Sequence, residues 1–100
     1  MVKWADFLIS EVRYNAEHTH IDKVKTHIDT GGGVGKFYEE IRSQVISNLQ
    51  NHKTYYTIVK KDDGWHRGSK VDIFPVNNKL FIKTSPNQTE DDNLGELPEF

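Results

Sequence analysis

The sequence predicts a small α+β domain in which a curved, five-stranded antiparallel sheet, or a partly closed small barrel, packs against one amphipathic helix. The chain has 100 residues, of which 35% are hydrophobic and 28% charged, and this is enough apolar content for one modest core. Most apolar residues alternate with polar ones, as in strands, whereas one stretch repeats them at helical spacing. The expected element order is ββαβββ, and no repeat or linker divides residues 1–100, which predicts a single domain.

The first two strands are expected to form a hairpin. Residues 5–14 and residues 18–28 are rich in strand-forming side chains, and residues 15–17 supply a turn between them. Ile21 and Val24 lie three positions apart, so they cannot share one face of a regular strand. We therefore expect a β-bulge at the two residues that follow Ile21.

A glycine-rich segment and a helix follow the hairpin. Residues 30–35 contain four glycines and predict a flexible loop. After this loop, Tyr38, Ile41, Val45 and Leu49 recur at spacings of three and four, which is typical of an amphipathic helix. The sequence therefore predicts the helix over residues 38–49.

Three more strands complete the predicted sheet. Their sequences are rich in β-branched and aromatic residues, and two asparagines can adopt the left-handed conformations of a tight hairpin turn. The expected segments are a strand at 54–59, a turn at 60–64, a strand at 70–76, a turn at 77–78 and a strand at 80–84.

The charges are distributed unevenly along the chain. Residues 1–89 hold all 13 Lys and Arg but 10 of the 15 Asp and Glu, whereas residues 90–100 hold the other five acids and no base. A disordered acidic tail does not need the apolar Leu94, Leu97 and Phe100. We expect these three residues to anchor an acidic tail, residues 87–100, onto a body formed by residues 1–86.

The composition also limits the class of protein. Cysteine is absent, which excludes disulfides, thiolate zinc sites and cysteine nucleophiles. The first ten residues contain only a short apolar run, which predicts neither a signal peptide nor a membrane span. These observations favour a cytoplasmic protein.

Several short motifs resemble a small bacterial family of unknown function, DUF3892. The resemblance covers nearly the whole chain and is most specific at the ending Asp92-Asn-Leu-Gly-Glu-Leu-Pro-Glu-Phe100. It implies a stand-alone bacterial cytosolic domain, and it carries no activity with it. The other matching motifs are Ala5-Asp-Phe-Leu-Ile-Ser10, Val12-Arg-Tyr14, His20-Ile-Asp-Lys-Val24, Trp65-His-Arg-Gly68 and Phe81-Ile-Lys-Thr84.

Three patterns that suggest catalysis or a cofactor are weak. The segment Gly31-Gly-Gly-Val-Gly-Lys36 is one residue too short for a phosphate loop, and Phe37 stands where such a loop needs Ser or Thr. His18 and His20 would project from one strand face as zinc ligands, with a third from His27, His52 or His66, but no Cys and no His-Glu-x-x-His pattern supports such a site. Glu39 and Glu40 fit the first turn of the predicted helix. We therefore expect no enzyme, no metal and no cofactor.

A basic, aromatic segment is more suggestive of binding. Residues 53–83 hold seven bases against three acids, interleaved with aromatic residues. Such mixtures bind nucleic acids on small curved sheets, although they also describe a solvated basic face over an aromatic core. The candidate binding residues are Lys60, Lys61, Trp65, Arg67, Lys70 and Lys83.

The sequence favours a non-enzymatic binding or adaptor protein. The expected partner is another protein, bound at an exposed sheet edge or along the groove of the tail. The alternative is a nucleic-acid-binding module that uses the basic, aromatic segment.

Overall fold

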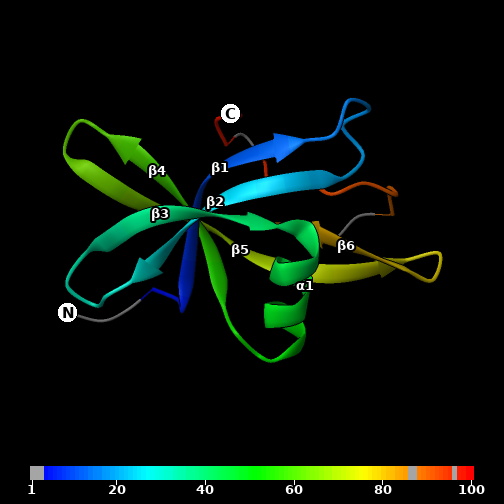
Figure 1. Ribbon diagram of the computed structural model, residues 1–100, viewed down its shortest axis with the longest axis horizontal. Helices are drawn as coiled ribbons and strands as arrows, with labels where there is room; N and C mark the ends of the chain where they lie inside the picture. The colour runs from blue at the N-terminus through cyan, green and yellow to red at the C-terminus, as the bar shows by residue number, and fades with distance from the viewer. Residues whose placement is uncertain (1–3, 86–87, 96) are drawn as a thin grey trace.

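The computed structural model describes residues 4–85, 88–95 and 97–100, and it shows a small, compact α+β domain with one helix in the described part of the chain (Figure 1). The strands form one mixed sheet in the order β3-β2-β1-β4-β5-β6, which does not close into a barrel. The elements are β1 (Phe7–Tyr14), β2 (Ile21–Asp29), β3 (Val34–Ile41), α1 (Arg42–Gln50), β4 (Tyr55–Lys61), β5 (Gly64–Val76) and β6 (Lys79–Lys83). The expected five-stranded, wholly antiparallel sheet is therefore wrong.

The extra strand is β3, which includes the first third of the predicted helix, residues 38–41. Tyr38 lies opposite Thr26 of β2, and α1 begins only at Arg42. Tyr38 and Ile41 belong to β3 and Val45 belongs to α1, so their helical spacing spans the junction of a strand and a helix. Val45 is the only helix residue that is fully buried. No helix in the described residues has the length and apolarity needed to cross a membrane.

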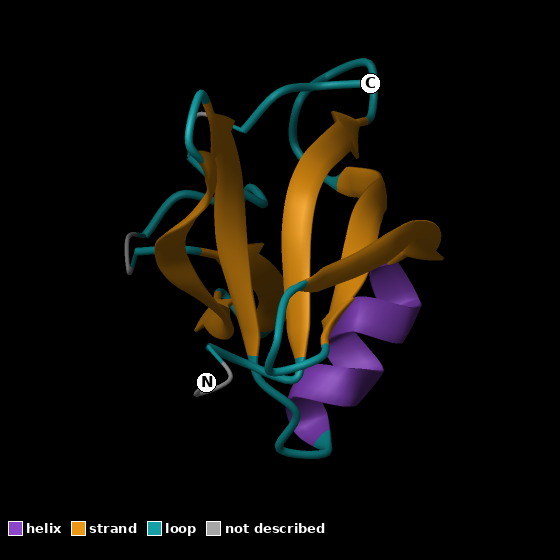
Figure 2. Ribbon diagram, turned by 90° about the vertical axis from the view of Figure 1, so that its left-hand side faces the viewer, coloured by secondary structure: helices purple, strands orange, loops and turns teal. Residues whose placement is uncertain are grey.

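The sheet is mixed because β4 returns parallel to β1. Phe7 lies opposite Tyr55 and Ile9 lies opposite Thr57 in this pairing. Parallel neighbours need a crossover connection, and the chain from the sheet edge through α1 provides it. Figure 2 shows α1 beside the strands at the end of the molecule away from the C-terminus. The helix thus determines where β4 enters the sheet.

Two irregularities shape the first hairpin. The register steps from Arg13 opposite Lys23 to Tyr14 opposite Ile21, so that one residue of β2 has no partner, and the predicted bulge is confirmed. A second shift in β1, at Ser10, was not predicted from the sequence. Because a bulge reverses the alternation of faces, it brings Ile9 and Val12 into the same core.

The apolar side chains form two clusters. The larger one lies on the face that carries α1, and it includes Ile9, Val12, Val24, Val45, Tyr55, Val71, Ile82, Leu94 and Leu97. The smaller one consists of Ala5, Leu8 and Ile58, with Trp65 packed against it. Leu8 and Ile9 are neighbours in a strand, so the two clusters lie on opposite faces of the sheet.

The hairpin of β5 and β6 forms as predicted at its turn. Asn77 and Asn78 both have positive φ angles, 51° and 65°, which is the conformation of a two-residue turn between antiparallel strands. β5 itself is one long strand, in which a Cβ at Gly68 would collide with Thr57. A glycine is therefore required where β5 passes β4.

The C-terminal segment lies across the body between β6 and β1. The Asn93 amide donates to the Ile82 carbonyl at 2.9 Å, and the Asn93 carbonyl accepts from the Thr84 amide at 3.1 Å. At the other end, the Phe100 amide donates to the Val12 carbonyl at 3.1 Å. The segment therefore adds backbone hydrogen bonds to β6 and to β1, two strands that are not neighbours in the sheet.

Candidate functional site

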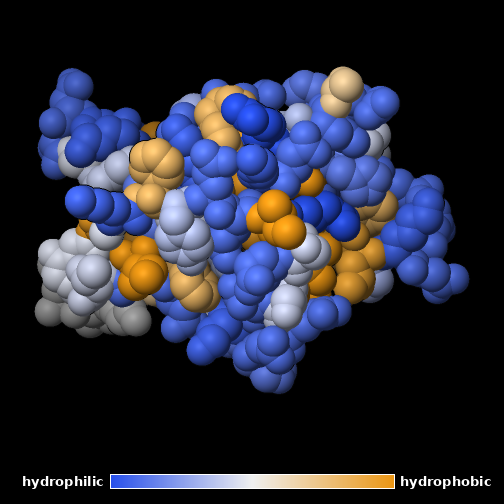
Figure 3. Space-filling view, in the orientation of Figure 1, coloured by the Kyte–Doolittle hydropathy of each residue, from blue (hydrophilic) through white to orange (hydrophobic). Residues whose placement is uncertain are grey.

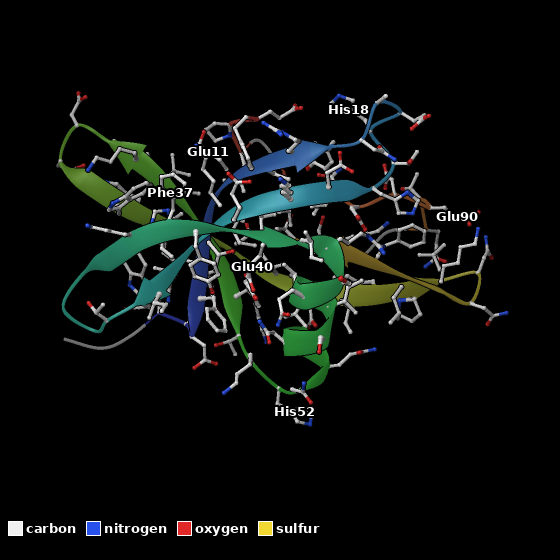
Figure 4. All side chains as sticks on the ribbon, viewed as in Figure 1. Glu11, His18, Phe37, Glu40, His52 and Glu90 are labelled. Carbon is white, nitrogen blue, oxygen red and sulfur yellow. The ribbon has the colours of Figure 1, made fainter. Side chains whose placement is uncertain are left out.

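An open groove lies between the edge strand β3 and the helix α1. Its volume is about 530 Å³, and it contains aromatic, amide and carboxylate side chains. Figure 4 shows Glu40 between β3 and α1. The lining residues are Phe7, Tyr38, Glu39, Glu40, Ile41, Gln44 and Asn48.

Glu40 is the buried carboxylate at this groove. It lies opposite the core residue Val24, so it points to the α1 side of the sheet, and only 5% of it is exposed. Its Oε1 accepts hydrogen bonds from the Tyr55 hydroxyl at 2.9 Å and from the Thr26 hydroxyl at 2.8 Å. Its Oε2 receives only a long contact of 3.3 Å from Asn48 Nδ2. The second oxygen therefore retains capacity to accept.

The donors that the described residues provide to Glu40 are all neutral. Among the described residues, no Lys, Arg or His forms an ion pair with it, whereas its neighbour Glu39 pairs with Lys23 at 3.3 Å. Burial, and secondarily the Glu40 charge, raise the pKa of Tyr55 and of Tyr38. The Glu40 carboxylate is therefore held by two hydroxyls and one amide that stay uncharged in the folded protein.

Asp92 is a second buried carboxylate, and its surroundings differ. Arg42 donates to it from Nε at 2.6 Å and from Nη2 at 3.1 Å. The backbone amides of Ile21 and Ile82 donate at 2.7 and 2.9 Å. Arg42 also donates to the Leu80 carbonyl. Asp92 thus connects the tail with β2, β6 and the start of α1.

The predicted basic residues do not form one surface. Four of them, Lys60, Lys61, Arg67 and Lys70, are exposed on β4 and β5, and Trp65 is half-buried beside them. The Lys60 ammonium lies 5.1 Å from the Trp65 ring centre, and the Arg67 guanidinium lies 5.4 Å from that of Tyr56.

Lys83 is separate from this group. It is completely buried, and its ammonium donates to the Thr89 carbonyl and lies 3.7 Å from Asp91. Its assignment to an exposed binding face is therefore wrong. Lys83 instead holds the first part of the tail, through Thr89 and Asp91.

The three apolar tail residues occupy two environments. Leu94 and Leu97 are buried in the larger core cluster. Phe100 stays half-exposed at the rim, where the Arg13 guanidinium and the Lys25 ammonium lie 4.7 and 4.8 Å from its ring centre. The first two residues thus contribute core packing, and the third contributes cation–π contacts.

The histidines are dispersed. His18 and His20 lie in the turn before β2 and not on a strand face, and His18 has a left-handed φ of 57°. His20 stacks on Phe81, whereas His27 is buried and contacts Ser10 Oγ at 2.8 Å. In residues 4–85, 88–95 and 97–100, no three metal-ligating side chains are arranged to hold an ion.

The sequence did not indicate that Glu40 and Asp92 are buried. Glu39 and Glu40 were expected in a helix but lie on β3, where residues alternate between faces. With residues 34–41 read as a strand, this alternation would have placed Glu40 inward. The contact between Arg42 and Asp92 spans 50 positions, and nothing local in the sequence indicates it.

The fold is a small α+β domain with a mixed, open sheet. No curated protein and no solved structure matches the chain. Residues 8–98 match the model of a family described as proteins of unknown function, DUF3892. The chain therefore belongs to the DUF3892 family, and the resemblance seen in its sequence is confirmed.

Proposed function

We propose that this protein is a protein-interaction module that binds an extended segment of a partner protein along β3. The observation that carries the proposal is the position of β3 at the edge of the sheet, with β2 on one side only. An edge strand presents alternate amide and carbonyl groups that an added strand can pair with.

The side chains of β3 support the same function. Of the five large hydrophobic residues exposed in the described chain, three lie on this strand: Phe37 at 51%, Tyr38 at 38% and Ile41 at 56%. Figure 3 shows separate hydrophobic patches on the face viewed in Figure 1. Edge strands that avoid pairing usually carry proline or several lysines, whereas β3 has no proline and a single lysine, Lys36.

The two edges of the sheet also differ. At β6, the Asn93 backbone already forms hydrogen bonds with the backbones of Ile82 and Thr84, so the tail covers part of that edge. For β3, the strand pairing in the described residues is with β2 alone. An added strand at β3 would also pass the groove, which offers a place for one of its side chains.

Selection from a random-sequence peptide library, followed by calorimetry on synthetic peptides, tests this function. Peptides that bind wild type should lose at least about tenfold in affinity with the double variant Phe37→Lys and Ile41→Lys. N-methylation of alternate peptide amides on one edge should abolish binding, because it removes donors to β3. The matched control is Val59→Lys, which changes an exposed apolar residue of β4.

Two results would contradict β3 pairing: an equal loss with Val59→Lys, or full affinity after N-methylation of either peptide edge. The nucleic-acid alternative has less support, because Lys83 is buried and the Trp65 and Tyr56 rings already lie against this chain's own cations. Tight, steeply salt-dependent binding of oligonucleotides would favour that alternative.

A further inference from the structure

We infer that the groove between β3 and α1 is a subsite for a cationic side chain, Lys or Arg, of the bound segment, with Glu40 as its anionic receptor. The peptide context of this inference rests on the proposed function. The groove chemistry itself rests on four observations: the burial of Glu40, its neutral partners, the aromatic walls and the absence of a base among the lining residues.

Burial of a carboxylate is costly unless a cation or several donors compensate it. This chain provides full compensation for Asp92, which has Arg42 and two backbone amides. Glu40 is 95% shielded and has no cation among the described residues, and its Oε2 has only the long Asn48 contact. A ligand ammonium or guanidinium would supply the missing charge and the missing donor.

The walls of the groove suit an organic cation. The rings of Phe7 and Tyr38 line it, and aromatic faces attract cations. The side-chain carbonyls of Gln44 and Asn48 can accept further N–H groups. A metal ion fits less well, because the neighbouring Glu39 already pairs with Lys23 and a hard cation requires several oxygen ligands.

The geometry of an added strand delivers a side chain to this groove. Tyr38 and Glu40 lie on the α1 side of β3, opposite Thr26 and Val24. Every second side chain of a strand paired with β3 would point to the same side, and directly opposite residues have Cβ atoms only about 5 Å apart. A Lys or Arg at one of these positions can extend over Tyr38 toward Glu40.

The first experiment uses a small probe and needs no peptide. Nα-acetyl-lysine N-methylamide is titrated into the protein, and the side-chain amide signals of Gln44 and Asn48 are followed by NMR. We expect saturable shifts of these signals, and none with Nα-acetyl-norleucine N-methylamide, whose side chain has the same four carbons but lacks the ammonium group. Equal shifts with the norleucine compound, or no shift with the lysine compound, would overturn the inference.

Variants locate the receptor. Glu40→Gln keeps an acceptor for Tyr55 and Thr26 but removes the charge, so the lysine probe should bind at least about tenfold more weakly. Glu11→Gln is the matched control, because it removes a carboxylate outside the groove that already has a lysine partner, Lys25, and it should weaken the probe by less than about threefold. Equal losses in both variants would mean that general negative charge attracts the probe, which contradicts the subsite.

The outcome for the subsite can be separated from that for β3 pairing. In peptides selected for binding, replacement of the Lys or Arg by norleucine should lower affinity about tenfold for wild type and have little effect for Glu40→Gln. If selected peptides bind β3 without any preference for a cation, the subsite is wrong and the interaction module stands. If the lysine probe binds but no extended peptide does, the module is wrong and the cation site stands.

Discussion

Two buried carboxylates of this domain, Asp92 and Glu40, show two different uses of a charge inside a small protein. Asp92 receives a bidentate Arg42 and the amides of Ile21 and Ile82. From the described part of the chain Glu40 receives only hydroxyl and amide donors, and it lines an open groove.

The difference separates a structural group from a candidate binding group. Breaking a compensated buried pair leaves a second buried charge, so such a pair holds elements together. At Asp92 these elements are the tail, β2, β6 and α1. A carboxylate that lacks a cation and faces a groove instead leaves its charge for a ligand to neutralise.

The largest expected effect is that of Asp92→Asn on stability. In either orientation the side-chain amide would place a donor against an Arg42 N–H and against the Ile21 or Ile82 amide, and it would leave the guanidinium without its anion. We expect this to cost on the order of 4 kcal/mol. Glu40→Gln should cost less than about 1 kcal/mol, because no cation loses its partner. Urea unfolding of both variants measures this comparison.

Asp62→Asn is the control for the Asp92 substitution. Asp62 is exposed in the turn between β4 and β5 and forms no ion pair with the described residues, so we expect a change within about 1 kcal/mol. Equal destabilisation by Asp92→Asn and Glu40→Gln would remove the distinction between the two carboxylates.

The next effect concerns the two environments of the tail residues. Leu94→Ala should lower the free energy of unfolding by about 3 kcal/mol, because it leaves a cavity in the larger cluster. Phe100→Ala should cost about 1 kcal/mol, since the ring is half-exposed and contributes contacts with Arg13 and Lys25. The order of the two urea midpoints checks this, and a reversed order would show that Phe100 is the main anchor.

The smallest effect tests the neutral donors of Glu40 through pH. Burial and the Glu40 charge raise the pKa of Tyr55, so above pH ~10 the unfolded chain loses a proton that the folded chain keeps. The contribution of Tyr55 to the free energy of unfolding is therefore fully present below pH ~10 and is lost as the pH rises further. Tyr55→Phe should cost about 1 kcal/mol near neutral pH, through the lost hydrogen bond, but show a shallower alkaline decline.

Urea midpoints at neutral pH and above pH ~10 measure both parts of this prediction. The residual decline in the variant should come from Tyr14 and Tyr38, whose pKa values burial also raises. An alkaline decline as steep in Tyr55→Phe as in wild type would show that Tyr55 does not keep its proton beside Glu40.

Much of the strand pattern was accessible from local features. The bulge after Ile21 follows from the spacing of two apolar residues, and the turn at Asn77 and Asn78 follows from their tolerance of positive φ. The β-branched run from residue 54 predicted a strand that the structure contains as β4. These features depend on short-range backbone and side-chain preferences, so a single sequence contains the relevant signal.

The sequence by itself determined the α+β class, the first and last hairpins, the apolar residues of the tail and membership of the DUF3892 family. Only the tertiary structure decided that residues 34–41 form a strand, that β4 runs parallel to β1, and that Glu40 and Asp92 are buried with different partners. The physical reason is the range of the interactions. Turns and bulges arise between near neighbours, whereas strand partners and buried charges are fixed by contacts between residues far apart in the chain.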